Sequence, residues 1–412
     1  MDKMSEQQWK RLDLVKRLDR GLLTVAEAGV IAGITERQMR RVREKVHERG
    51  KAALVHGNKG RPPPNRIEEK TRSLVIELFR TKYAGFNDQH FTEKLAEEEN
   101  IVASRPSIRR WLRAAGLAAA RKHRPPKHRA RRDRKAQAGL MLLWDGSRHD
   151  WLEGRGPLMT LMGAVDDATS ELLPGAHFVE QECTVGYLRV LRDVVRERGV
   201  PYSIYMDMHG TLKRNDAHWT VQEELSGKQI PTHVGRALEI LNIEAIFALS
   251  SQAKGRVERQ WNTQDRLVSE LRLAKVCTLE KANGLLARLL PKSGRRFAIA
   301  ARDEKPAWRK LLREIDLDRV CSFFYETTVL NDNTVRIAGL LIDIPPGPQR
   351  RSYAQARVEV RQLLDGSWRV YFQNQEIARA ASTATTELRA LKRRKLGATS
   401  KAFRKAIRQL TG

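Results

Sequence analysis

The chain has 412 residues, enough for roughly two to four domains and at least one sizeable core. Lys and Arg outnumber Asp and Glu by 77 to 49, and the resulting formal net charge of +28 favours a polyanionic partner such as nucleic acid. No run approaches the roughly 18 apolar residues of a membrane span, no signal-peptide core is present, and three scattered cysteines exclude a disulfide framework and a CxxC zinc pair. We therefore expect a cytoplasmic, DNA-associated protein with no membrane partner.

The first 55 residues predict a helix-turn-helix DNA-binding domain (1–55). TVAE places Thr24 at an N-cap with Glu27 three residues later, and TERQ does the same with Thr35 and Gln38. Gly33 lies in the short turn between the two helices, as the motif requires. The second helix, 36–48, carries a basic face typical of a recognition helix, with the candidate DNA contacts Arg37, Gln38, Arg40 and Arg41. An ordinary helical hairpin with a charged outer face is the alternative.

A Gly/Pro linker, 56–66, precedes a second predicted helix-turn-helix domain, 67–118. Three consecutive prolines favour an extended linker. Lys59 and Arg61 within it resemble short arms that enter the A·T minor groove, and a plain spacer explains the segment equally well. The second domain has three amphipathic helices. Its last helix, capped by Ser104, presents Arg109 and Arg110 as candidate DNA contacts.

Two blocks hold much of the excess charge. Residues 121–136 carry nine Lys and Arg against one Asp, and residues 384–412 carry nine against one Glu. Such blocks bind nucleic acid by releasing counterions, although solvated linkers and tails can have the same composition. We interpret 119–138 as a basic linker and 381–412 as a basic, helical tail. Sixteen extended residues reach about 50 Å, so the linker could let the N-terminal domains of one protomer bind DNA cut by another.

After the basic linker the pattern predicts an α/β core with a mixed sheet, 139–280. Strands are expected at 140–146, twice within 157–178, at 202–210 and before residue 249, with helices at 184–199 and from 236. Asp145 ends the first strand, and Asp207 ends the fourth, 62 residues later. Glu258 follows after another 51 residues, in the helix after the fifth strand. Because neighbouring strand ends can share one edge of a sheet, these three acids form a candidate site.

Three carboxylates in this arrangement suit a site with two metal ions. Two Mg²⁺ ions ~4 Å apart bind through a few carboxylates and the substrate phosphate; one activates a hydroxyl and the other stabilises the leaving oxygen. Around Glu258 lie three candidate phosphate contacts, Lys254, Arg256 and Arg259. The alternative for Glu258 is a solvated acid on a basic helix.

Other acids compete for the same role. Asp166 and Asp167 fall at a predicted hairpin turn, and turn aspartates usually serve turn geometry. Asp150 could replace Asp145 only if the first strand ran five residues longer, which Gly146 argues against. His149 and His209 lie near the predicted site, where histidines are more often structural.

These residues resemble the DDE integrase core of bacterial insertion-sequence transposases. The resemblance rests on the two aspartates and on SQAKGRVERQWNTQDRL around Glu258, and WDGSRHDWLEGRGPLMTLMGAVDDAT is similar to the ISNCY group. It implies an RNase H-like fold, with Asp145, Asp207 and Glu258 as the catalytic, metal-binding triad. It also implies two Mg²⁺ (or Mn²⁺) ions per active site. The chain departs from many such enzymes at Asp265, where a Lys or Arg is common.

The remaining segments complete a multidomain chain. Residues 281–322 predict a helical connector (LEKANGLLARLL and PAWRKLLREIDL), and 323–380 predict a small β-barrel-like domain with turns at Asp332-Asn333 and Asp365-Gly366. The resemblance implies a DNA transposase, a polynucleotidyl transferase that binds transposon-end DNA and target DNA as a homodimer or higher oligomer on paired ends. The alternatives are a catalytically inactive, transposase-like, sequence-specific regulator and an RNase H-like nuclease that cuts without joining.

Overall fold

The computed structural model describes residues 4–55, 67–117, 133–214, 219, 221–248, 264–296, 298–348 and 351–388. The chain divides into two compact units, residues 1–74 and 75–412. None of the helices in the described ranges combines the length and apolar character needed to cross a membrane.

Three helices and a short 3₁₀ turn make up the first unit up to residue 55: α1 (Glu6–Asp19), α2 (Val25–Ala32), α3 (Glu36–Arg49) and η1 (Gly50–Leu54). Both predicted capping boxes are confirmed, at Thr24 with Glu27 and at Thr35 with Gln38. Gly33 ends α2 with φ +67°, the left-handed conformation that favours glycine. The small core of this unit contains Leu14, Val15, Leu18, Ala28 and Met39.

A second helical region follows, with α4 (Glu69–Thr81), α5 (Asp88–Glu97) and α6 (Arg105–Ala114). Its core is aromatic: Phe79, Tyr83 and Phe91 pack edge-on or tilted with ring centroids 5.0 and 5.4 Å apart. The predicted Ser104 cap is confirmed, since its hydroxyl accepts a hydrogen bond from the Ser107 backbone. We refer to residues 67–117 as the second helical region.

The core is a five-stranded mixed sheet with the order β3-β2-β1-β4-β5. Its strands are β1 (Met141–His149), β2 (Met159–Asp166), β3 (His177–Val179), β4 (Ser203–Met206) and β5 (Glu244–Phe247). β1, β2 and β3 pair antiparallel, whereas β4 pairs parallel with both β1 and β5. The predicted mixed sheet is therefore confirmed.

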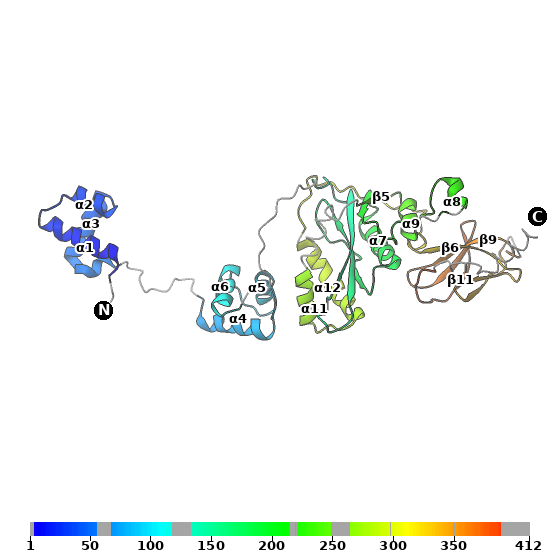
Figure 1. Ribbon diagram of the computed structural model, residues 1–412, viewed down its shortest axis with the longest axis horizontal. Helices are drawn as coiled ribbons and strands as arrows, with labels where there is room; N and C mark the ends of the chain where they lie inside the picture. Colours follow the sequence, from blue (N-terminus) through cyan, green and yellow to red (C-terminus); the bar gives the residue numbers. More distant parts are fainter. Residues whose placement is uncertain are drawn as a thin grey trace, which may run out of the picture. The chain divides into compact units, whose positions relative to one another are not determined.

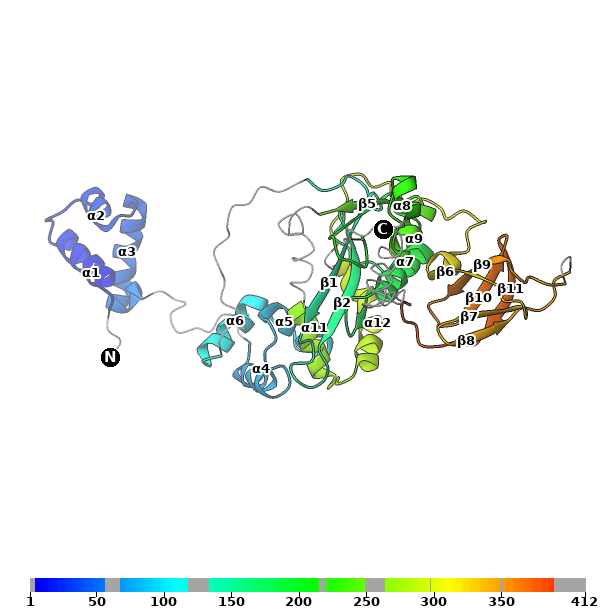
Figure 2. The same ribbon diagram turned by 45° about the vertical axis from the view of Figure 1, so that its right-hand side comes forward.

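Helices cover both faces of this sheet (Figures 1 and 2). On one face lie α7 (Thr184–Arg198) and α9 (His233–Ile240), which pack with Leu142 and Trp144 of β1. On the other lie α11 (Gln264–Leu273) and α12 (Leu279–Arg296), which pack with Met141 and Leu143. Alternate side chains of β1 thus enter two separate hydrophobic clusters. A short helix, α8 (Val221–Ser226), lies in the long polar segment after β4.

Two expectations from the sequence are wrong. β1 does not end near Gly146 but continues to His149, because β2 pairs with it throughout, from Leu142↔Asp166 to His149↔Met159. Residues 306–316 are not helical. Arg309 instead exchanges backbone hydrogen bonds with Val200, at 2.8 and 2.9 Å, while Leu311 and Ile315 pack against the core. This tertiary pairing outweighs the local helical periodicity.

A β domain follows α13 (Leu317–Val320). A four-stranded sheet of order β11-β10-β9-β6 and a β7-β8 hairpin enclose one hydrophobic cluster that includes Trp368. The strands are β6 (Phe323–Thr328), β7 (Thr334–Ile337), β8 (Leu340–Asp343), β9 (Arg357–Gln362), β10 (Trp368–Phe372) and β11 (Gln375–Ala380).

The β domain contacts the core around His233 of α9. Its Nδ1 accepts a hydrogen bond from the Phe324 backbone at 3.2 Å, and its ring packs edge-on against Phe323 and Tyr325. Residues after β11 return to the core, where Glu387 accepts a hydrogen bond from Thr184 of α7 at 2.7 Å. Burial lowers the pKa of the His233 imidazole to about 4. The folded state therefore favours neutral His233.

We predict that this histidine makes the fold acid-sensitive. Its folded-state pKa lies below the unfolded value of about 6.5, so its contribution is present above pH 6.5 and is lost as the pH falls towards 4. In His233→Asn, the amide oxygen can still accept from Phe324 but does not titrate. Denaturant unfolding should show that the wild type loses on the order of 1–3 kcal/mol more than this variant between pH 7 and pH 4. Parallel pH profiles for the two proteins would contradict the assignment.

Candidate active site

Asp145 and Asp207 lie on adjacent parallel strands of the core sheet. The β1–β4 pairs are Met141↔Ser203, Leu142↔Ile204 and Leu143↔Tyr205, each 62 positions apart. Asp145 and Asp207 have the same separation, so the register carried two residues further aligns them. Both are half-buried. The alignment therefore brings the two predicted carboxylates to one place on the sheet.

The prediction that β1 ends near Asp145 is, however, wrong. Asp145 is an internal residue of β1, paired with Gly163 of β2, and only the pairing with β4 stops at Leu143. Beyond that point the β4 side of β1 has no partner strand within the described residues, whereas its β2 side stays paired. By strand alternation Asp145 shares a face with Met141 and Leu143, which is the face covered by α11 and α12.

Another carboxylate, Glu182 from the loop before α7, lies against the opposite face of β1, because Gly146 alternates with Asp145 and faces the side of Leu142 and Trp144. A Cβ built on Gly146 would lie 3.0 Å from Glu182 Oε2, so the carboxylate occupies the space that any larger residue after Asp145 would need. Tyr187 donates its phenol hydrogen to Glu182 Oε1, and His209 Nδ1 lies 3.8 Å from the same oxygen. Three chain segments, the second half of β1, the loop before α7 and the segment after β4, thus approach one another around Glu182.

Tyr187 reports the negative charge of this neighbourhood. The ring is buried and stacks on Trp144 with centroids 5.3 Å apart. Burial raises the pKa of the Tyr187 phenol strongly, and the charges of Glu182, Asp207 and Asp145 raise it further. The phenol therefore stays protonated and available as a hydrogen-bond donor to Glu182.

Neither Glu182 nor Tyr187 was predicted from the sequence. Glu182 lies in an irregular segment between β3 and α7, where no periodic pattern marks it. Tyr187 occupies an apolar position of an amphipathic helix and looks like an ordinary core residue. The one available signal was Gly146, directly after Asp145, because a glycine inside a strand indicates a close approach by another group.

The donor atoms at this place are suitable for a hard divalent cation, since carboxylate oxygens are the ligands that Mg²⁺ prefers. Within the described ranges, no three His, Cys, Asp or Glu side chains form a group that could hold a metal ion. Asp145 and Asp207 could supply two ligands. The third predicted ligand, Glu258, lies outside the described residues, as do Lys254, Arg256 and Arg259.

The competing acids have structural partners. Asp150 accepts a hydrogen bond from the Gly154 backbone at 3.1 Å and closes the turn after β1. Asp166 is buried and accepts from the backbones of Gly139 and Thr169 at 2.7 and 2.9 Å. Asp167 accepts from the Lys135 backbone at 2.8 Å. These contacts favour turn-forming roles over a place beside Asp145.

The predicted DNA contacts are distributed over two helices. Arg37, Gln38, Arg40 and Arg41 are exposed on α3, where Arg40 pairs with Glu36 one turn earlier. Arg109 and Arg110 are exposed on α6. Lys59 and Arg61 lie outside the described residues.

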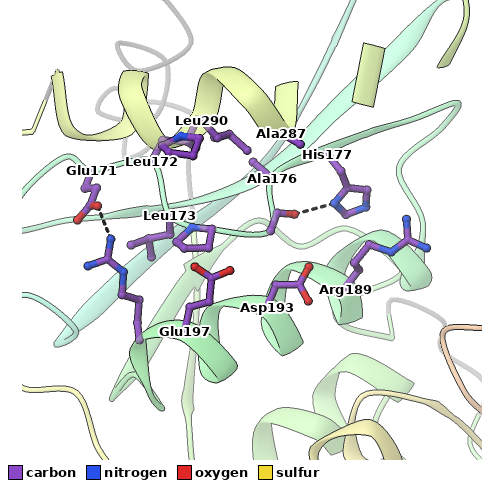
Figure 3. Close-up of a pocket in the computed structure, with 14 residues that line it drawn as sticks. Glu171, Leu172, Leu173, Ala176, His177, Arg189, Asp193, Glu197, Ala287 and Leu290 are labelled. Carbon is purple, nitrogen blue, oxygen red and sulfur yellow. Dashed lines mark hydrogen bonds and ion pairs between the residues drawn. The ribbon is translucent and has the colours of Figure 1, made fainter. Parts of the chain in front are cut away.

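A separate cleft of about 380 Å³ opens at the other end of α7 (Figure 3). His177, Arg189 and Asp193 line it together with Leu290 of α12. His177 Nδ1 donates to the Gly175 carbonyl at 2.8 Å, and burial lowers the pKa of the imidazole. Neither of the two predicted aspartates lines this cleft, so it is distinct from the carboxylate site.

Comparison with known proteins identifies the family. No protein-family profile matches the chain. Over 397 residues the chain is 32% identical to y4bF of Sinorhizobium fredii, a protein named as a transposase, covering 92% of this chain and 84% of that relative. The chain belongs to the transposases. It is also 30% identical over 313 residues to the transposase for insertion sequence IS1202 of Streptococcus pneumoniae, covering 67% of this transposase and 65% of the relative.

Solved structures give weaker matches. A chain of the simian T-cell lymphotropic virus intasome in complex with PP2A regulatory subunit B56 gamma aligns at a TM-score of 0.31 and 13% identity, covering 76% of this transposase and 100% of that chain. A pre-cleavage Mos1 transpososome aligns at 0.17 and 10% identity, covering 71% and 99%.

We predict that Gly146→Ala impairs this transposase. The added Cβ would lie 3.0 Å from Glu182 Oε2, so either this carboxylate or the β1 backbone that carries Asp145 must shift by a few tenths of an ångström. A shift of about 1 Å can cost on the order of a hundredfold in rate, so we expect this smaller shift to cost up to about tenfold. Strand cleavage on DNA carrying the transposon end measures the effect. Gly210→Ala is the matched control, because nothing lies within 4 Å of a Cβ there. Equal rates for the two variants would show that the position of Glu182 is irrelevant.

Proposed function

We propose that this transposase binds the ends of an insertion sequence and catalyses Mg²⁺-dependent strand cleavage followed by transfer of the freed 3′-OH to target DNA. The observation that carries the proposal is the parallel register of β1 and β4, which, extended two residues past Leu143↔Tyr205, would place Asp145 opposite Asp207. Glu258 completes the proposed triad from the segment before α11. Two Mg²⁺ or Mn²⁺ ions held by these carboxylates would supply activation of the attacking hydroxyl and stabilisation of the leaving oxygen.

The chain's own residues fix the carboxylates in place. β1 is paired with β2 from Leu142 to His149 and with β4 from Met141 to Leu143, so the strands that lead to Asp145 and Asp207 are held in one register. Glu182, held by Tyr187 on the other face of β1, adds to the negative charge of this region of the sheet, which favours a bound cation. No covalent intermediate with the protein is needed, because a hydroxyl attacks the phosphodiester directly.

For DNA recognition we propose two reading helices. α3 would contact the end through Arg37, Gln38, Arg40 and Arg41, and α6 through Arg109 and Arg110. Lys59 and Arg61 in the linker, with Lys254, Arg256 and Arg259 around Glu258, would add phosphate contacts. One chain offers one triad, so coordinated cleavage at two ends requires a dimer or a higher oligomer.

The triad can be tested directly. Asp145→Ala, Asp207→Ala and Glu258→Gln should each reduce strand cleavage and joining in Mg²⁺ to the level of DNA without protein, because each removes a proposed ligand. Binding to the end should remain within about threefold of wild type, since the reading helices are untouched. Asp150→Ala is the matched control, because that carboxylate contacts the Gly154 backbone. Near-normal joining by any triad variant removes that residue from the proposal.

The reading helices are tested by paired substitutions. Replacing Arg40 and Arg41, or Arg109 and Arg110, with Ala should weaken binding to the end in a footprinting titration. A lost base contact should cost about 1–3 kcal/mol and relax specificity, whereas a lost phosphate contact should lower affinity evenly and flatten the salt dependence. Arg17→Ala on α1, whose side chain pairs with Asp13, serves as the control. Unchanged footprints in both double variants would rule out these two helices as readers.

A further inference from the structure

α5 of the second helical region packs on α11 of the catalytic core through charged side chains. His90, Glu93 and Lys94 form one stripe of α5 at helical spacing. Arg266 and Glu270 face them from α11. Arg266 binds Glu93 through two hydrogen bonds of 2.6 and 3.2 Å, while Glu270 Oε1 lies 2.7 Å from His90 and 3.0 Å from Lys94.

These contacts are largely hidden from solvent. These side chains are only 6–17% exposed, so water cannot easily solvate a charged group that loses its partner. Burial opposes ionisation of Glu270, but hydrogen bonds from His90 and Lys94 outweigh it and lower the pKa of the carboxyl. Breaking one partner of such a buried pair leaves an uncompensated charge, and the contact therefore specifies one docking geometry.

A second set of contacts strengthens the same docking. Arg272, also on α11, donates to the Ala84 carbonyl before α5 and binds Glu153 in the turn after β1 at 2.8 Å. Leu273 packs against the aromatic cluster of the second helical region. α11 therefore has contacts on two faces. One face contacts the second helical region, and on the other Val268 and Leu271 pack against the core sheet.

The position of α11 links this docking to the active site. The helix begins at Gln264, six residues after Glu258, and packs on the face of the sheet that β1 presents with Met141 and Leu143. On the other side, α5 packs on α6, which carries the exposed Arg109 and Arg110. A short chain of contacts thus connects a candidate DNA-reading helix with the helix that follows the third proposed ligand.

We propose that Glu93, Arg266 and Glu270 are positioning residues that fix the second helical region on the catalytic core of its own chain. DNA read by α6 is thereby presented to the active site of the same protomer; this step rests on the proposed function. The basic linker reaches far enough to allow exchange between protomers, but the buried pairs hold this region in place. Action on a partner's DNA end is then left to the first helical unit, residues 4–55.

Charge exchange across the Glu93–Arg266 pair tests the proposal. Glu93→Arg and Arg266→Glu should each lower end-directed strand cleavage by about tenfold, because like charges then meet in a buried contact. Both substitutions in one chain should restore cleavage to within about threefold of wild type. Arg357→Glu, at an exposed pair with Glu326 in the β domain, is the matched control and should have no effect.

Mixing the two single variants decides between same-chain and exchanged docking. Same-chain docking leaves a repulsive pair in every molecule, so the mixture should stay impaired. If the region docked on a partner, the arginine introduced at position 93 of one chain would face the glutamate introduced at position 266 of the other. Recovery of the mixture to the level of the double variant would then overturn the proposal. Single variants as active as wild type would overturn it as well.

Hydrogen exchange of the intact chain without DNA separates this inference from the proposed function. Amides of residues 264–273 should exchange faster in each single variant and in their mixture, and should regain protection in the same-chain double variant. If a charge-reversed chain fails to fold, the milder variants Glu93→Gln and Arg266→Gln replace it. Residues 264–273 should also exchange faster in these variants than in the wild type. Protected α11 in a chain that cleaves no DNA would refute the proposed function alone, whereas unchanged exchange in all variants would refute the docking.

Discussion

The parallel pairing of β1 with β4 is the constraint on which the site depends. It joins two segments 62 residues apart in the chain and fixes their register at Met141↔Ser203. A shift of one residue would turn every side chain of β4 to the opposite face and would separate Asp207 from Asp145. The two hydrophobic clusters prevent such a shift, because Ile204 and Met206 belong to one and Tyr205 to the other. The packing of the core therefore also determines where the candidate ligands lie.

α7 contributes to the site and to the architecture at once. Its first turns carry Thr184, which binds Glu387 of the segment returning from the β domain, and Tyr187, which holds Glu182 beside Gly146. α11 has a comparable double role on the opposite face, between the sheet and α5. α7 and α11 therefore connect the core sheet with the segment returning from the β domain and with the second helical region, one on each face of the sheet.

The sequence predicted the features that local chemistry determines. The Thr24 and Thr35 capping boxes, the Ser104 cap and the strand-helix order of the core follow from short-range patterns. The predictions from the sequence were wrong where contacts with distant parts of the chain determine the local structure. β1 passes Gly146 because β2 remains paired with it, and residues 306–316 are extended because Arg309 pairs with Val200. Asp145 and Asp207 could be proposed from the sequence, but Glu182 could not, because only the fold brings its loop to Gly146.

The central claim is that Asp145 and Asp207 bind the same catalytic cation. Anomalous scattering from crystals of the full chain with transposon-end DNA and Mn²⁺ tests it most directly, because Mn²⁺ takes the oxygen ligands that suit Mg²⁺ and can be located independently of its neighbours. The account predicts an anomalous peak in contact with a carboxylate oxygen of each aspartate. A well-occupied Mn²⁺ on the scissile phosphate with neither aspartate as a ligand would contradict it.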